Sequence, residues 1–448
     1  MNNIQDKVVG SWLGMAVGDA MGSAIRGLKP ATISQCFRQM DGFKDVRPFL
    51  GKGVKHYKMQ GLYGSQTQRA LVVCDTLLKK KTPDLNTLAE GFLQLAQGGP
   101  ENHFGVYRQP EAEFRKAVDH LSSSPQEAGD NPIGGACLAL AIPIALYYQK
   151  SGPRVRDHCL ETCMMMSRNP QELEGTALTA FLINHFLTLE ALPGAEPPTV
   201  LKDILRVAKE FCRETQAHLQ NLLGKAANET GLGALGDVFQ LLEEKGREHT
   251  LAEMLALICQ NVSHHFKQPI SHAAQGHVLT LLPLAMVVLV HSDSDFPPAL
   301  ASALNHGGQA DKLGAITGAL AGALYGFARI PQEWKAGLVN GKEIKNRGEA
   351  LFNRQFSPGL KDLFEMESGL TFKEYENAKK YKKRPSLASR KTKSPARKIP
   401  VQDLETDLIG PAVSKKENPA QWRKYQKDKT RKKRDRRKSL DKFVFHEE

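Results

Sequence analysis

Apolar residues recur at helical spacing through most of the first 350 residues of this 448-residue chain. Residues three and four apart share one face of an α-helix, so this spacing predicts one helix after another. Alternating runs of Val, Ile and Thr, which favour β-strands, are few. Clusters of Gly and Pro interrupt the pattern, as at 98–100 and 193–198. The pattern therefore predicts an all-α bundle.

Two of the expected helices carry glycine at every fourth position. The first glycine ladder comprises Gly10, Gly14, Gly18 and Gly22, and the second comprises Gly314, Gly318, Gly322 and Gly326. Spacing of four places each set on one helix face, although a glycine inside a helix costs about 1 kcal/mol relative to Ala. Close approach of another helix, or of a ligand, offsets that cost. Both explanations are open at this point.

Two apolar stretches, 133–148 and 278–290, resemble membrane spans in composition. Each is shorter than about 18 residues and contains a proline, Pro143 or Pro283, which favours buried core helices and no membrane span. The seven scattered cysteines include no Cys-x-x-Cys pair, and the N-terminus lacks a secretory pattern. We therefore expect a cytoplasmic protein, or a nuclear one in a eukaryote.

Basic charge is concentrated at the C-terminal end of the chain. Residues 375–448 hold 24 of the 61 Lys and Arg residues but 10 of the 48 Asp and Glu residues, a net charge of +14. The remaining residues carry a net charge of −1. Blocks of like charge bury little surface and favour disorder. We expect a helical domain at 1–355, a connecting segment at 356–374 and a mostly disordered basic tail at 375–448.

The tail has the composition of a polyanion-binding segment. Phosphate-neutralising cations flank Trp422 and Tyr425, whose rings are suited to stacking on bases. The expected binding residues are Arg423, Lys424, Arg431, Lys432, Lys433, Arg434, Arg436, Arg437 and Lys438. RNA, DNA or a ribosome is the expected partner. The alternative is a solvated appendage that only raises solubility.

Four motifs give the chain a family resemblance over about residues 5–345. GSWLGMAVGDAMGSAI, YGSQTQRALVVCDTLL, SRNPQELEGTALTA and NHGGQADKLGAITGALAGALYG occur in that order. They resemble the N-terminal, TDDT, proline and GGDTDT motifs of the ADP-ribosylglycohydrolase family. The resemblance implies an orthogonal all-α bundle with a cleft that binds ADP-ribose and two magnesium ions.

The residues that hold magnesium in this family are mostly replaced here. Gly64, Ser65 and Gln66 stand where the first motif has Thr, Asp and Asp. Gln309, Asp311 and Lys312 stand where the second motif has Asp, Asp and Thr. Only Asp311 matches a metal ligand, while Thr67 matches the closing threonine of the first motif. Arg26, Gly135 and Ser167 replace an acidic residue, an asparagine and a histidine of the family pattern.

Magnesium requires carboxylate charge and ordered oxygen ligands, and one matching carboxylate does not hold two ions. We therefore expect no magnesium site and a pseudoenzyme that binds ADP-ribose or another phosphorylated small molecule without cutting it. The ligand-binding candidates are Arg26, Ser65, Gln66, Thr67, Gln309, Asp311 and Lys312. A guanidinium such as that of Arg26 binds phosphate bidentately, although Arg26 and Lys312 could instead face solvent or pair with Asp19 and Asp311.

Two other functions are consistent with the same residues. An active hydrolase with a rebuilt site would use Asp311 with Asp19 or Glu174, whereas a purely structural interaction protein would have a filled cleft. The histidines at 264, 265, 272 and 277 lack the same-face spacing of a helical zinc site. Cys159 and Cys163 follow His158 on an apolar helix and are expected to be buried thiols.

Overall fold

The computed structural model describes residues 3–124, 134–150, 152–189, 197–224, 231–245, 249–266, 269–292 and 295–382, with the backbone alone at 197–202 and at 382. The chain divides into two units, Met1–Pro385 and Ser386–Glu448. The second unit lies outside the described residues, and so do the expected polyanion-binding residues between Arg423 and Lys438.

Helices account for nearly all of the regular structure, and the described ranges contain no β-strand. The α-helices are α1 (Asn3–Ile25), α2 (Pro30–Phe37), α3 (Ser65–Lys80), α4 (Leu85–Leu95), α5 (Ala112–Leu121), α6 (Leu138–Tyr148), α7 (Pro153–Met164), α8 (Pro170–Thr188), α9 (Pro197–Leu223), α11 (Ala234–Lys245), α12 (Leu251–Ser263), α13 (Val278–His291), α14 (Phe296–Asn305), α15 (Ala310–Tyr325), α16 (Gln332–Gly337), α17 (Gly341–Asn353) and α18 (Leu363–Lys382). Short 3-10 helices occur at Arg47–Phe49, Ala273–Gln275 and Phe327–Arg329. The predicted all-α architecture is confirmed.

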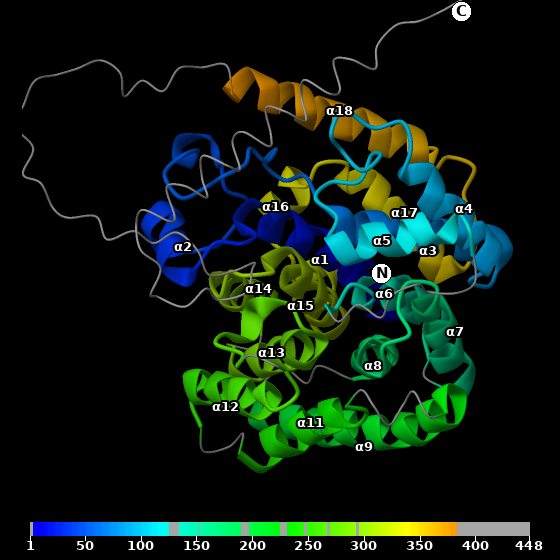
Figure 1. Cartoon of the computed structure of the whole chain (residues 1–448), viewed down its shortest axis with the longest axis vertical. Coiled ribbons are helices and arrows are strands. Elements are labelled where there is room, and N and C mark those ends of the chain that lie inside the picture. The colour runs from blue at the N-terminus through cyan, green and yellow to red at the C-terminus, as the bar shows by residue number, and fades with distance from the viewer. Residues whose placement is uncertain are drawn as a thin grey trace, which may run out of the picture. The chain divides into compact units, whose positions relative to one another are not determined.

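The two glycine ladders pack against each other and join α1 to α15 in an antiparallel pair (Figure 1). The facing positions are Gly10 with Gly322, Gly14 with Gly318, Gly18 with Gly314, and Gly22 with Ala310. A Cβ added to any of these glycines would lie under 3.0 Å from backbone atoms of the opposite helix. Close helix packing therefore accounts for the ladders, and the last glycine, Gly326, ends α15 with φ 87°.

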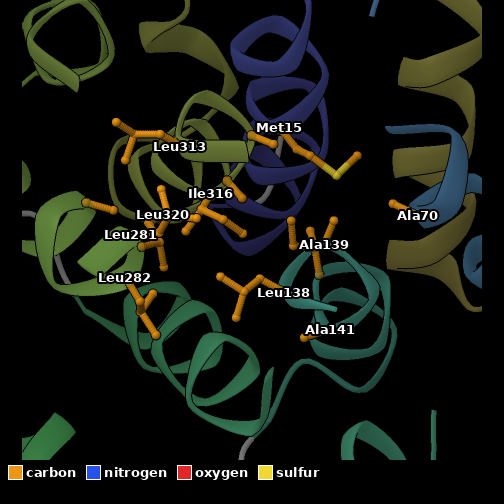
Figure 2. Packing of buried hydrophobic residues seen from close by; sticks show 14 of the residues in the cluster. Met15, Ala70, Leu138, Ala139, Ala141, Leu281, Leu282, Leu313, Ile316 and Leu320 are labelled. Carbon is orange, nitrogen blue, oxygen red and sulfur yellow. The ribbon is translucent and has the colours of Figure 1, made fainter. Parts of the chain in front are cut away.

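Apolar side chains of α6, α8 and α13 pack against α15 in the core. Figure 2 shows Leu138 and Ala139 of α6 facing Leu281, Ile316 and Leu320 from the two later helices. The helices α6 and α13, each with an internal proline, are almost wholly buried, as the sequence predicts. Within the described residues only α1 is long and apolar enough to cross a membrane, and 94% of its apolar window is buried in this core.

Helix α18 packs against α3 and α4 and extends beyond the start of the tail that composition indicates. Its Glu367 carboxylate is fully buried, 2.6 Å from Nη2 of Arg108 and 2.6 Å from the Tyr63 hydroxyl that donates to it. Tyr381 stacks on Tyr57 with ring centroids 4.9 Å apart. The boundary between residues 374 and 375 thus falls inside a packed helix, because charge counting does not detect the inward face of an amphipathic helix.

Candidate functional site

The register of the two ladders determines which polar residues meet. Because Gly22 of α1 faces Ala310 of α15, the last turns of α1 lie beside the first turn of α15. Asp19 of α1 and Arg26, which directly follows α1, therefore lie near Asp311 and Lys312. The first turn of α3, which contains Ser65, Gln66 and Thr67, joins them through a contact with Asp19. We call this group of residues the central site.

Asp19 is fully buried and holds the start of α3. Its Oδ2 accepts hydrogen bonds from the backbone nitrogen and the hydroxyl of Thr67, each at 2.8 Å, and its Oδ1 accepts one from Ser23 at 3.0 Å. Burial, with a further contribution from the Asp311 carboxylate, raises the pKa of Asp19 to about 6. The retained threonine of the first motif therefore binds a carboxyl group that takes up a proton near neutral pH.

Arg26 pairs with Asp311 rather than facing solvent. Its Nη1 lies 3.1 Å from Oδ2 of Asp311 and also donates to the carbonyl oxygen of Gln109. The other Asp311 oxygen, Oδ1, is buried and accepts no hydrogen bond within the described ranges. Burial opposes ionisation of the guanidinium, but Asp311 and Glu111 outweigh it and raise the pKa of Arg26.

Glu111 is the centre of a second ion-pair cluster. Its Oε2 lies 2.5 Å from Nη2 of Arg69, and its Oε1 lies 3.2 Å from Nζ of Lys312. The amide nitrogen of Gln66 donates to the same Oε1 at 2.7 Å. Burial favours the neutral carboxyl, yet Arg69, Lys312 and Arg26 together hold the pKa of Glu111 well below its usual range. Glu111 is therefore an anion bound by buried cations.

Arg69 links this cluster to the loop before α6. Its guanidinium donates to the Ser65 hydroxyl at 3.1 Å and to the Ala136 carbonyl at 2.6 Å, and lies 3.9 Å from the ring centroid of Phe114. The side chain is fully buried. Ser65, which replaces a carboxylate of the family pattern, thus accepts a hydrogen bond from a cation.

The backbone amides of the loop before α6 donate hydrogen bonds to a carboxylate of the same chain. Glu172 of α8 accepts from the nitrogen of Gly134 at 2.5 Å, from that of Gly135, and from that of Cys137 at 3.4 Å. Lys312 donates to the Gly134 carbonyl at 2.5 Å. Burial raises the pKa of Glu172 even though the amides oppose the shift.

The structure brings most of the candidate residues together. Ser65, Gln66 and Lys312 converge on the Arg69–Glu111 pair, while Arg26 and Asp311 form their own pair. Lys312 pairs with Glu111, not with Asp19 or Asp311. Thr67 binds Asp19. Gln309 precedes α15, and its buried Oε1 has no hydrogen-bond partner among the described residues.

Of the remaining candidates, Glu174 makes no contact with the central site within the described residues, whereas His277 lies near Lys312, which together with burial lowers the pKa of His277. Glu174 is fully buried near Cys212 and Asp237, and burial raises its pKa to about 8. His272 has its ring 6.0 Å from that of His306, and His277 has its ring 4.3 Å from that of Phe266. Cys159 and Cys163 are buried thiols, as predicted. The proposed pairing of Glu174 with Asp311 therefore has no contact that supports it.

Sequence reasoning missed four residues of this region: Arg69, Glu111, Glu172 and Lys58. Arg69 directly precedes an apolar run, and a charged residue at such a position is a sequence signal for a buried ion pair. Glu111 and Glu172 gave none, because their partners are distant in the chain. Lys58 is half-buried, and burial lowers its pKa to about 8 although Glu374 opposes the shift. Arg26 and Asp311 also influence the pKa of Lys58, and only the fold brings these distant residues near it.

Magnesium, which the family resemblance implies, does not fit these residues. The ion requires about six oxygen ligands in near-octahedral geometry with carboxylate charge among them. Asp311 is paired with Arg26, and Glu111 is shared by Arg69 and Lys312. In the part of the chain that the structure describes, no three His, Cys, Asp or Glu residues form a group suited to a metal. Arginine and lysine side chains therefore neutralise Asp311 and Glu111, two of the carboxylates of the central site.

Comparison with known proteins finds relatives that match most of this chain. A relative from Rhodospirillum rubrum, ADP-ribosyl-[dinitrogen reductase] glycohydrolase, is 23% identical over 351 residues, which cover 78% of this chain and 96% of the relative. The ADP-ribosylarginine hydrolase Tri1 of Serratia proteamaculans (strain 568) is 22% identical over 352 residues, 78% of this chain and 79% of that protein.

A solved structure titled ADP-ribosylglycohydrolase-related protein complex has the same fold, with a TM-score of 0.52 and 22% identity. The similarity covers 80% of this chain and 100% of the solved chain. The family model described as ADP-ribosylglycohydrolase matches residues 1–360, which include every motif of the central site but end before α18. The chain therefore belongs to the ADP-ribosylglycohydrolase family.

Proposed function

We propose that this chain is a non-hydrolysing member of its family that binds an ADP-ribosyl group. The observation that carries the proposal is the pairing of Lys312 with Glu111 at 3.2 Å and of Arg26 with Asp311 at 3.1 Å. These two cations, Lys312 buried and Arg26 partly buried, neutralise carboxylates that a divalent ion would need. A site without that ion lacks a metal-activated water for glycosidic cleavage.

Two buried acceptors favour binding over a filled, purely structural site. Oδ1 of Asp311 and Oε1 of Gln309 accept no hydrogen bond within the described ranges. A buried acceptor without a donor costs about 1–3 kcal/mol, so a ligand that brought a donor to either atom would be stabilised. Ribose hydroxyl groups are such donors. The two relatives are named for action on ADP-ribosylated substrates, which agrees with this ligand class.

The proposal predicts binding without turnover. In calorimetry, the Kd for ADP-ribose is expected to stay within about twofold when magnesium is replaced by EDTA, since no metal links ligand and protein. Asp311→Ala should weaken binding about tenfold through loss of a charged acceptor. Asp295→Ala, which removes a more exposed carboxylate paired with Arg329, serves as the matched control. Magnesium-dependent release of ADP-ribose from a modified protein would refute the proposal.

A second candidate function is metal-independent hydrolysis by two carboxyl groups. It is favoured by one observation, the raised pKa of about 6 for Asp19 beside Asp311. A carboxyl group that holds a proton near neutral pH is suited to general acid catalysis. In the same release assay, turnover in EDTA that disappears in Asp19→Asn and in Asp311→Asn would establish this function instead.

For the C-terminal tail we propose contact with a nucleic acid, on the basis of its charge of +14 over residues 375–448. Removing the residues after Lys382 keeps α18 whole. This truncation is expected to lower affinity for single-stranded RNA at least tenfold and to flatten its salt dependence, because fewer counterions are released. Unchanged affinity and salt slope would identify the tail as a solvated appendage.

A further inference from the structure

The segment 106–111 lies between the central site and α18. On one side of it, the Gln109 carbonyl oxygen accepts a hydrogen bond from Arg26, and Glu111 binds two cations of the central site. On the other side, Arg108 pairs with a carboxylate of α18. This helix packs against α3 and α4 (Figure 1) and begins after the last residue of the family match. A helix outside that match therefore contacts a segment that builds the site.

Arg108 is buried, and all three of its guanidinium nitrogens donate hydrogen bonds. Nη2 lies 2.6 Å from Oε2 of Glu367, and Nη1 donates to the Thr371 hydroxyl at 3.0 Å. Nε donates to the Tyr63 carbonyl at 2.8 Å, while the backbone nitrogen of Arg108 donates to Oε1 of Gln68 at 2.7 Å. Two residues of α18 and two residues near the start of α3 thus fix Arg108.

Both residues of α18 also help to hold the backbone of the segment. The Thr371 hydroxyl donates to the carbonyl oxygen of Val106 at 2.6 Å, and the Gln68 amide donates to that oxygen at 2.9 Å. The same amide nitrogen of Gln68 lies 2.9 Å from Oε2 of Glu367. Val106 and Arg108 are therefore both anchored to α18, directly or through Gln68.

Gln109 adopts a strained backbone conformation between these anchors and the central site. Its φ of 52° lies in the left-handed region, which is unfavourable for a residue other than glycine and persists where the surrounding contacts determine it. Arg108, which α18 fixes, precedes Gln109, and the Gln109 carbonyl contacts Arg26. Loosening Arg108 would therefore let this turn relax and would withdraw a hydrogen-bond acceptor from Arg26.

We propose that α18 holds segment 106–111 in the position that the ligand of the central site requires, with Glu367 as a positioning residue that acts through Arg108. Glu367 itself contacts Tyr63, Gln68 and Arg108. Displacement of a binding group by about 1 Å weakens its contacts strongly, so the segment needs such support. The role deepens the proposed function and rests on it for the identity of the ligand, ADP-ribose.

Glu367→Gln in the full-length chain tests this role. Glutamine keeps the size of the side chain and an acceptor oxygen for Tyr63, but removes the charge that holds Arg108. The Kd for ADP-ribose in calorimetry is expected to rise about tenfold. Asp75→Asn is the matched control, since it removes the charge from another buried arginine pair, Asp75 with Arg347 at 2.9 Å between α3 and α17. With this control the Kd should stay within about twofold at a similar loss in melting temperature. Equal values of Kd for the two variants would overturn the role.

Thr371→Val is a milder change that removes one hydroxyl and keeps the shape of the side chain. It takes away the donor to Val106 and an acceptor for Arg108, so the Kd for ADP-ribose is expected to rise about threefold. An unchanged Kd in this variant would contradict the role even if Glu367→Gln did not fold.

Hydrogen exchange separates this role from the proposed function, because it needs no ligand. Glu367→Gln is expected to speed amide exchange in segment 106–111 about tenfold, and Asp75→Asn should leave it unchanged. In the unaltered chain, ADP-ribose should slow exchange in α18 about threefold, since coupling between two sites is reciprocal. Faster exchange in Glu367→Gln without any binding of ADP-ribose would refute the proposed function alone. Unchanged exchange in that variant, or binding of ADP-ribose without slower exchange in α18, would overturn the positioning role.

Discussion

Gly18→Ala is expected to lower the free energy of unfolding by about 3–5 kcal/mol, more than most core substitutions. The added Cβ would lie under 3.0 Å from the carbonyl group of Gly314 in the opposite helix. Backbone atoms cannot rotate away as a side chain can, so α1 and α15 must separate. Urea denaturation should show a lower midpoint with an unchanged slope.

Gly369→Ala is the control for the preceding change. Gly369 lies inside α18, and an added Cβ there would meet no atom within 4 Å. Alanine has the higher helix propensity, so this variant is expected to be more stable by about 0.5–1 kcal/mol. Similar midpoints for the Gly18 and Gly369 variants would show that the ladder contacts are not what holds the two helices together.

Glu367→Ala is expected to cost about 3–5 kcal/mol, because it leaves the guanidinium of Arg108 buried without its carboxylate. Glu367 also accepts hydrogen bonds from Tyr63 at 2.6 Å and from Gln68 at 2.9 Å, so three donors lose their partner. Thermal unfolding followed by circular dichroism measures the loss.

An exposed ion pair provides the comparison for Glu367. Arg206 and Glu210, one turn apart on α9, lie 3.1 Å apart with about half of each side chain exposed. Glu210→Ala is expected to cost less than about 0.5 kcal/mol, since water screens the pair. The double variant Arg108→Met with Glu367→Leu should recover part of the stability lost in Glu367→Ala, and a further loss would show that the cost is not electrostatic.

The sequence was sufficient for the helical architecture because the relevant signal is local. Glycine every fourth residue predicted close approach along α1 and α15, and internal proline with short apolar runs predicted that α6 and α13 are core helices. The surface that packs against a glycine ladder is determined by residues far away in the sequence. That Gly18 meets Gly314 rather than a ligand became clear only from the fold.

The central site was predictable only in part, for the same reason. The motifs identified Gln66, Asp311 and Lys312 as residues that lie close together, but not the carboxylate between them. Glu111 follows a loop with no helical or motif pattern, and its partners Arg69 and Lys312 are 42 and 201 positions away. The reach of α18 was missed because its lysines suggested a tail while Glu367 and Thr371 face inward.

The pairing of charges in the central site also makes its composition hard to reverse one residue at a time. Replacing Lys312 alone leaves Glu111 bound to Arg69, and replacing Arg26 alone leaves Asp311 buried without a cation. An unpaired buried charge costs about 3–5 kcal/mol, comparable to much of a domain's total stability. Building a site for a divalent ion would therefore require several substitutions at once, and an intermediate sequence that lacks Arg26 but keeps Asp311 would be at a disadvantage in folding.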